Sequence, residues 1–345
     1  MRDGVGSRER RVAWRLTQVT ILAVTSLLVL SVADGWDENG PSGQSGEPSA
    51  VTEPATDKAP DRIDPEQLDS VSPPEPTIAP NKLRTFTLVA TGELLIHEFV
   101  ADTAALYGGD EFDFSPMFRR VQPILAGADL ALCHLETPLS PDNSRFEFYP
   151  LFLVPFQLAA AIGGAGYDGC SVASNHLLDD GEGGVVATLG HLADAGVAAS
   201  GAAPDPTGVG PAWFSPGKVT VAHLSYTDTM NVASLPSAPP WLVNHLEASR
   251  VLADADDAVA NGAEFVVVSL HFGKPEYQIG LSAKQSEIAE QLLTSSDIDL
   301  VIGHGSHMVQ PVVHRNGKYA IVGLGNFLSN QPGDERRRCS ECPPA

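Results

Sequence analysis

Two hydrophobic periods alternate along most of the chain. From about residue 85, short runs rich in Val, Leu and Ile alternate with longer segments whose apolar residues recur every three or four positions, as at Val185, Leu189 and Leu192. The short runs are typical of buried strands, and the longer period is typical of helices with one apolar face. The pattern predicts an α/β fold built from layers of helices and strands. Strands are expected at 85–90, 129–133, 169–173, 219–224, 265–270, 300–302 and 319–324, and helices at 115–126, 156–165, 181–195, 246–261 and 282–294.

An apolar stretch near the N-terminus follows neither period. Residues 16–33 contain no charged side chain, and residues 1–33 as a whole carry five Arg against Asp3 and Glu9. A helix of that length spans about 27 Å, close to the thickness of the hydrocarbon core of a bilayer. A basic flank before an apolar stretch is typical of export signals. We interpret 1–33 as a signal peptide or an uncleaved N-terminal transmembrane helix, with a buried core helix as the alternative. We therefore expect an exported, membrane-anchored or secreted protein of the cell envelope.

Residues 34–84 differ in composition from both neighbouring segments. They contain nine Pro and eleven Asp or Glu, and almost no aromatic residues. Such a segment cannot bury enough apolar surface to offset its conformational entropy. We expect 34–84 to be a disordered acidic linker, 85–331 to form one domain, and 332–345 to be a disordered tail.

Charge and cysteine content exclude several classes of protein. The 345 residues include 43 acidic and 21 basic side chains, a formal charge of -22. Non-specific nucleic-acid binding requires a basic surface, so no nucleic-acid partner is expected. Four Cys are too few for a disulfide-stapled scaffold. We predict that Cys133 and Cys170 are two buried thiols, with a bridge between them as the alternative, and that Cys339 and Cys342 form no metal site.

Strand after predicted strand is followed by side chains that can bind a metal ion or carry a proton. In layered α/β folds, ligands gather outside the carboxyl ends of the strands. Each residue taken singly is an ordinary loop residue or cap, but five strands that end this way indicate a shared polar site. Carboxylate, imidazole and amide oxygen suit Mn, Fe, Zn or Mg. The strand-end residues are Glu93, His97, His134, Glu136, Asn175, His176, Asp179, Asp180, His271, His304, His307 and Asn326, whereas His191, His223, His245 and His314 are interpreted as structural.

Six short motifs occur in order between about residues 85 and 331. Together they resemble the CapA family of capsule-synthesis proteins, whose domain is related to calcineurin-like metallophosphoesterases. The resemblance implies an α/β/β/α sandwich. Because the family domain normally continues beyond the last motif, truncation at the C-terminus, with a sheet strand missing, is one interpretation. The motifs are Gly92-Glu93, the Ala-Asp-Leu and His-Leu-Glu-Thr-Pro segments within 128–138, and segments 166–181, 269–277, 299–311 and 324–327.

The resemblance also implies roles for individual residues. Glu136 would bind or bridge metal, and His176 would donate a proton beside a scissile group. One or two divalent ions (Mn, Fe, Zn or Mg) would be held there, because paired metals stabilise an oxyanion and lower the pKa of a bound water. The implied metal ligands are Glu93, Glu136, Asn175, His271, His304 and His307.

Several positions depart from the family pattern. Glu93 stands where the family has Asp, and His134 where Asn is usual. Gly305 and Ser306 replace a His-Pro pair, which removes one imidazole from that loop. The Asp-x-His and Gly-Asp-x-x-Asp motifs of well-studied phosphoesterases are not intact. A complete two-metal centre therefore does not follow from the motifs, and a metal near Glu93 would have to shift or be lost.

Three functions remain open at this point. The first is an envelope accessory protein for synthesis or export of poly-γ-glutamate or a similar anionic polymer, with the membrane and the polymer synthase or export subunits as partners. The second is a secreted metal-dependent phosphoesterase or amide hydrolase. The third is a non-catalytic binding module on the same fold. Because the chain is acidic, contact with a polyanion is expected to be local, through the metal and the histidines at the strand ends.

Overall fold

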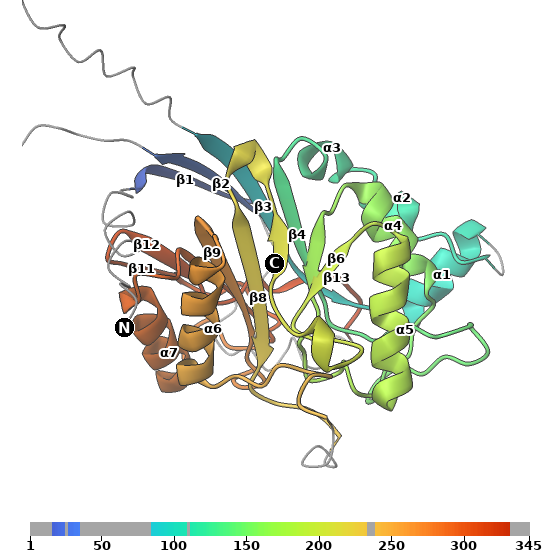
Figure 1. Cartoon of the computed structure of the whole chain (residues 1–345). Helices are drawn as coiled ribbons and strands as arrows, with labels where there is room; N and C mark the ends of the chain where they lie inside the picture. Colours follow the sequence, from blue (N-terminus) through green and yellow to red (C-terminus); the bar gives the residue numbers. More distant parts are fainter. Residues whose placement is uncertain (1–15, 25–26, 35–83, 109–110, 233–238, 332–345) are drawn as a thin grey trace, which may run out of the picture.

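Two β-sheets lie face to face with helices on their outer sides (Figure 1). This computed structural model describes residues 16–24, 27–34, 84–108, 111–232 and 239–331, and for the first two ranges only the backbone is considered. Two isolated turns of 3-10 helix, Pro206–Gly208 and Pro216–Lys218, flank β7. The strands are β1 Leu16–Val24, β2 Leu27–Asp34, β3 Thr85–Leu95, β4 Leu130–Leu135, β5 Gly169–Ser171, β6 Ala198–Ser200, β7 Ala212–Phe214, β8 Val221–Thr227, β9 Phe265–His271, β10 Leu300–His304, β11 Val312–Arg315, β12 Lys318–Ile321 and β13 Asn326–Ser329.

The strand order brings distant parts of the chain together. One sheet has the order β1-β2-β3-β4-β5-β6, and β13 pairs with the second half of β3, beyond the residues that pair with β2. The other sheet has the order β11-β12-β10-β9-β8-β7. Strands β3 to β6 run parallel to one another, as do β8, β9, β10 and β12. Their carboxyl ends therefore meet along one edge of each sheet.

Alternation along the strands produces three apolar layers. On β4, Leu130 and Leu132 belong to the layer between the sheets, whereas Ala131 and Cys133 face the helices. On β9, Phe265 and Val267 face the other sheet in the same way. Successive side chains of a strand point to opposite faces, so β4 and β9 are buried on both sides. The predicted α/β/β/α sandwich is confirmed.

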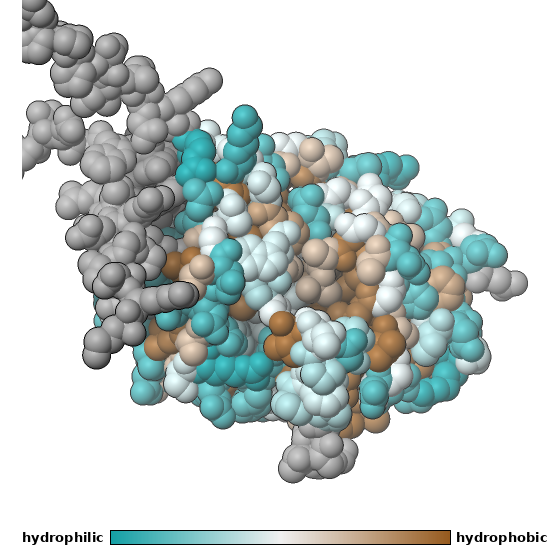
Figure 2. Space-filling view, in the orientation of Figure 1, coloured by the Kyte–Doolittle hydropathy of each residue, from teal (hydrophilic) through white to brown (hydrophobic). Residues whose placement is uncertain are grey.

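Helices cover the outer face of each sheet. The apolar stripe of α5 is confirmed, since Val185 and Leu192 are fully buried and Leu189 packs against the same core. On the face seen in Figure 2, hydrophilic and hydrophobic residues are interspersed in small patches. The helices over the first sheet are α1 Glu98–Gly108, α2 Ser115–Phe118, α3 Gln122–Leu125, α4 Gln157–Ala165 and α5 Gly181–Asp194, and those over the second are α6 Ala248–Ala260 and α7 Ala283–Thr294.

The expectation of one helix over 115–126 is wrong. The segment forms two single turns, α2 and α3, with Pro123 in the first turn of α3. Proline lacks an N–H and its ring clashes with the carbonyl four residues earlier, so a continuous helix cannot pass through this position. Helix α1 was not expected, because Phe99, Leu106 and Tyr107 are exposed on its outer face and obscure the apolar stripe.

The expectation of a helix over the N-terminal apolar stretch is also wrong. Backbone hydrogen bonds join β1 to β2 as an antiparallel pair, and β2 extends the sheet by pairing with residues 85–91 of β3. The stretch is rich in β-branched residues, which favour strands, and the edge of β3 supplies backbone partners. Within the described ranges, no helix combines the length and apolar character needed to cross a membrane. The export role of residues 1–33 stays a prediction.

Cys133 and Cys170 form a disulfide bond, so the prediction of two separate thiols is wrong. The two residues face each other directly in the parallel register of β4 and β5, with their Cα atoms 4.4 Å apart. This separation lies within the range that a disulfide can span. The linker over 35–83, the tail and its Cys339-x-x-Cys342 pair lie outside the described residues.

Candidate metal centre

Strand register gathers the polar residues into two rows that face each other. In the first sheet, Glu93 on β3 pairs with His134 on β4 and with Asn326 on β13. In the second sheet, His271 ends β9 and pairs with His304, which ends β10. His134, His271 and His304 continue the alternation of Leu132, Val267 and Ile302, so all three point into the layer between the sheets. At the carboxyl ends of these strands, imidazoles therefore take the place of the apolar side chains that fill the rest of the layer.

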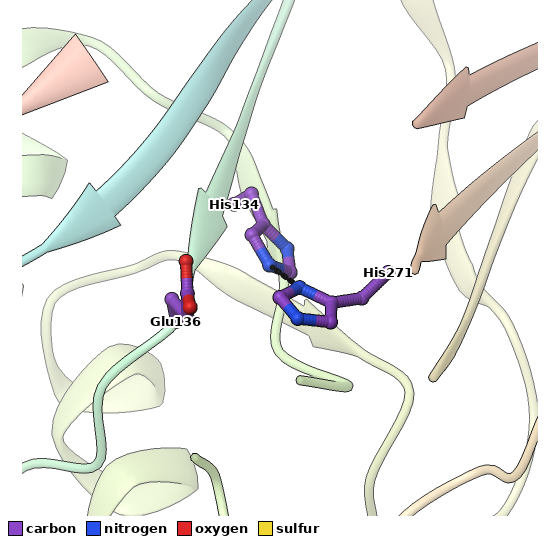
Figure 3. A group of neighbouring side chains, drawn as sticks. All are labelled: His134, Glu136 and His271. Carbon is purple, nitrogen blue, oxygen red and sulfur yellow. Dashed lines mark hydrogen bonds between the residues drawn. The ribbon is translucent and has the colours of Figure 1, made fainter. Parts of the chain in front are cut away.

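The first group of potential ligands comprises His134, Glu136 and His271, and we call it the imidazole group. One ligand atom from each residue lies within 4.8 Å of those of the others, and all three residues are buried. Figure 3 shows the two rings meeting edge to edge beside the carboxylate, with His134 Nε2 3.0 Å from His271 Nδ1. The ring of His304 stacks on His134 at a centroid distance of 4.1 Å.

Burial keeps these histidines neutral. It is the main cause that lowers the pKa of His134 and of His271, and the neighbouring imidazoles lower both further. The pKa of His304 is lowered for the same reasons. A neutral imidazole retains a lone pair on one nitrogen, and this is the form that binds metal.

The second group comprises Glu93, Glu136 and His307, and we call it the carboxylate group. Glu93 is fully buried and accepts hydrogen bonds from the Gly305 backbone N–H at 2.7 Å and from His307 Nδ1 at 3.3 Å. Gly305 has φ +87°, and a Cβ there would meet the Phe272 carbonyl oxygen at 2.3 Å, so the loop that presents this N–H requires glycine. Burial alone would lower the pKa of His307, but the carboxylates of Glu136 and Glu93 outweigh it and raise the pKa to about 10.

Glu136 belongs to both groups. Neither of its carboxylate oxygens has a hydrogen-bond partner among the described residues, although the residue is fully buried. Burial raises its pKa to about 7, and the attraction of His307 opposes that rise. Buried carboxylates are ordinarily paired, hydrogen-bonded or bound to a metal. The unpartnered oxygens therefore fit a cation bound between the two groups.

Two further predicted ligands lie outside both groups. Asn175 has its Oδ1 buried and unpartnered among the described residues, while its Nδ2 donates to the Asn231 side chain. His304 has a buried Nδ1 that likewise lacks a partner within the described ranges. These are the amide and imidazole atoms that the sequence suggested as ligands, so the donor set fits a divalent ion.

His176 occupies a separate position, beside an acidic residue. Its Nδ1 donates to Asp179 Oδ2 at 2.6 Å, and the edge of its ring meets Phe152 at 4.6 Å between centroids. Asp179 Oδ2 also accepts from the Phe152 backbone N–H. The hydrogen bond at Nδ1 leaves Nε2 as the nitrogen that can exchange a proton.

Sequence reasoning missed several residues that orient these groups. His134 and Asp179 were noted as strand-end residues, but neither was predicted to be a ligand or a catalytic residue. Ser171 faces His134 from β5, with its Oγ 2.8 Å from His134 Nδ1, and strand pairing could have revealed this contact. Asn231 lies in an irregular loop with its Nδ2 3.2 Å from His176 Nε2, to which it can donate a hydrogen bond, and no sequence pattern signals it. His97 is held by Leu95 and Ser329 against Phe152.

Comparison with known sequences identifies relatives. The chain is 25% identical to the capsule biosynthesis protein CapA of Bacillus anthracis over 266 residues, which cover 74% of this chain and 63% of that protein. It is 27% identical over 223 residues to a probable polyglutamine synthesis accessory protein of Mycobacterium tuberculosis, with 59% and 57% covered. The PGA biosynthesis protein CapA of Bacillus subtilis is 23% identical over 260 residues, with 70% and 62% covered. The matches thus span less than two thirds of each relative.

Two solved nucleotidase structures align with part of this chain. The NAD nucleotidase of Haemophilus influenzae aligns with a TM-score of 0.41 at 15% identity, over 62% of this chain and 39% of that chain. A 5'-nucleotidase precursor from Thermus thermophilus aligns with a TM-score of 0.37 at 15% identity, over 56% of this chain and 38% of that chain.

The model of the family described as bacterial capsule synthesis protein PGA_cap matches residues 87–331. The chain belongs to this family of bacterial capsule synthesis proteins.

Proposed function

We propose that this protein is an exported accessory protein for the synthesis or export of an anionic capsule polymer, poly-γ-glutamate or a similar polyanion. Family membership and the names of the three relatives support the polymer. The polymer synthase or export subunits are its proposed partners. The arginine-rich N-terminal sequence supports export and membrane attachment, and so does the Cys133–Cys170 disulfide, since disulfides persist mainly in oxidising compartments.

At the strand ends, the proposed cofactor is one or two divalent ions (Mn, Fe, Zn or Mg). The observation that carries this proposal is Glu136, whose buried oxygens have no hydrogen-bond partner among the described residues and lie within reach of two ligand groups. A divalent ion there would lower the pKa of a water molecule and stabilise negative charge on the scissile group. The ligands in this proposal are those of the two groups together with Asn175 and His304.

Hydrolysis of an amide or phosphoester is the activity that the neighbouring residues suit best. Water adds across the scissile bond, and the leaving amine or alcohol takes a proton, for which His176 Nε2 is the donor. Asp179 fixes the orientation of the ring through Nδ1. For an accessory protein, such a reaction would trim or release polymer chains.

Metal content and hydrolysis measured on the same full-length samples test this proposal. We expect stoichiometric divalent metal in the wild type and in His176→Ala, together with cleavage of poly-γ-glutamate or bis(p-nitrophenyl) phosphate by the wild type alone. Loss of a general acid typically lowers the rate by about 10²- to 10⁴-fold. His191→Ala is the control, because His191 packs on Phe156 away from both groups. Equal rates of cleavage in wild type and His176→Ala would eliminate His176 as the proton donor. Metal without hydrolysis of either substrate would favour a binding module.

A further inference from the structure

His134 is the member of the imidazole group that lies on the first sheet, and it is fully buried near the end of β4. Its ring contacts two other imidazoles: it stacks on His304 at 4.1 Å and is hydrogen-bonded to His271 at 3.0 Å between nitrogens. An imidazole at this position places a nitrogen donor in the interior of the proposed metal centre.

The hydrogen bonds of Ser171 determine which nitrogen of His134 carries the proton. Ser171 Oγ donates its one hydrogen to the Cys133 carbonyl oxygen at 3.2 Å. With this hydrogen bond made, Ser171 Oγ accepts at its 2.8 Å contact with His134 Nδ1, which then carries the proton. Because a neutral imidazole has one proton, Nε2 keeps a lone pair, and this nitrogen points toward His271 and Glu136.

The spacing of the donor atoms suits a shared ion. Zn²⁺ bonds imidazole nitrogens at about 2.1 Å in tetrahedral geometry, which places two of them about 3.4 Å apart on one ion. His134 Nε2 and His271 Nδ1 are 3.0 Å apart, close to this separation, and the Glu136 carboxylate, whose oxygens lack a partner among the described residues, lies within 4.8 Å of both. Both nitrogens could bind one ion only with the His271 proton on Nε2.

We propose that His134, which binds through Nε2, makes this centre selective for imidazole-preferring ions such as Zn²⁺ over Mg²⁺ and Mn²⁺. The inference rests on the proposed metal site, whose ligands include His134, and adds the bonding atom and the selectivity. Imidazole suits Zn²⁺, Fe²⁺ and Cu²⁺, whereas oxygen-rich sites suit Mg²⁺ and Mn²⁺. His223 provides the contrast within the same layer: it is buried and its Nε2 bonds Ser269 Oγ at 2.8 Å, but it belongs to neither ligand group.

Competition between metals tests the inference on the metal-free full-length protein. Wild type, His134→Asn and the matched control His223→Asn are equilibrated with equimolar Zn²⁺ and Mn²⁺, and bound metal is measured by mass spectrometry. We expect His134→Asn to weaken Zn²⁺ binding by about 100-fold while changing Mn²⁺ binding by less than about threefold, since imidazole is the donor that favours Zn²⁺. His223→Asn should bind both metals like the wild type.

Anomalous diffraction from Zn²⁺-loaded wild-type crystals provides a test that does not depend on the folding of a variant. It should place the ion in bonding contact with His134 Nε2. An ion that has no contact with His134, or equal Zn²⁺ affinity in wild type and His134→Asn, overturns the inference but leaves the proposed metal site in place. Absence of stoichiometric metal from the wild type overturns both.

Discussion

The two ligand groups share Glu136 but satisfy their buried polar atoms in different ways. In the carboxylate group, Glu93 already has a backbone donor and a cationic partner, because the surrounding carboxylates raise the pKa of His307 to about 10. In the imidazole group, burial lowers the pKa values of the histidines, which therefore supply no positive charge to Glu136. The Glu93–His307 pair of the first group is charge-compensated without a metal, whereas the second group contains no cationic side chain.

This difference suggests an order of occupancy. A cation entering the imidazole group meets neutral nitrogens and a carboxylate that accepts no hydrogen bond from any described residue. A cation entering the carboxylate group must displace the His307 proton and compete with an existing ion pair. Since metal ligands must be deprotonated, displacement of a proton reduces apparent affinity. We therefore expect the imidazole group to fill first.

The largest effect is expected from Glu136→Gln, which removes the carboxylate common to both groups. Loss of the shared charge should lower metal affinity of both groups by at least about 100-fold, or about 2.7 kcal/mol. Metal per chain after dialysis, measured by mass spectrometry, should fall close to zero. Glu287→Gln on the exposed surface of α7 is the control and should retain the wild-type content. A variant that keeps half of the metal would mean that one group binds without Glu136.

A smaller effect, confined to one group, is expected from His307→Ala. In the metal-free protein this variant leaves Glu93 fully buried with only the Gly305 N–H as partner. Removal of one member of a buried pair typically costs about 3 kcal/mol or more. Urea unfolding in EDTA at pH 7 should show this loss, while Zn²⁺ binding at the imidazole group persists.

The pH dependence and a double variant check the cause of that loss. Because the folded pKa of His307 lies above its unfolded value of about 6.5, the pair stabilises the fold fully below pH 6.5. That stability disappears as the pH rises through about 10, so wild type and His307→Ala should converge there. Glu93→Gln combined with His307→Ala should recover part of the loss at pH 7. Parallel curves at all pH values would contradict the ion-pair explanation.

The sequence predicted the frame of the molecule well. All seven strands expected between residues 85 and 324 are present, and strand-end position brought Glu93, Glu136, His271 and His307 into the two groups. Hydrophobic period and strand polarity are local properties, and parallel strands place their carboxyl ends on one edge. The hydrophobic periodicity along the chain was therefore sufficient to predict that these candidate ligands lie close together.

The errors arose where distant residues decide the outcome. The N-terminal stretch has the length of a membrane helix, but its pairing with β3 depends on an edge 50 residues or more away. Likewise, the Cys133–Cys170 bridge depends on the register between β4 and β5. The tautomer of His134 depends on Ser171 and a carbonyl, neither of which carries a motif. Such contacts follow from register, and register was not predicted.

The smallest effect is expected from a substitution at the contact between β4 and β5 that orients His134. Ser171→Ala removes the acceptor that fixes the proton on His134 Nδ1. Loss of an orienting partner beside a ligand typically lowers metal affinity by about tenfold. Ser269→Ala is the matched control, because Ser269 makes the same kind of contact to the buried His223 at 2.8 Å. Isothermal titration with Zn²⁺ should show weaker binding of the first ion in Ser171→Ala and unchanged binding in Ser269→Ala. If both serines behave alike, metal binding at the imidazole group does not depend on the proton position of His134.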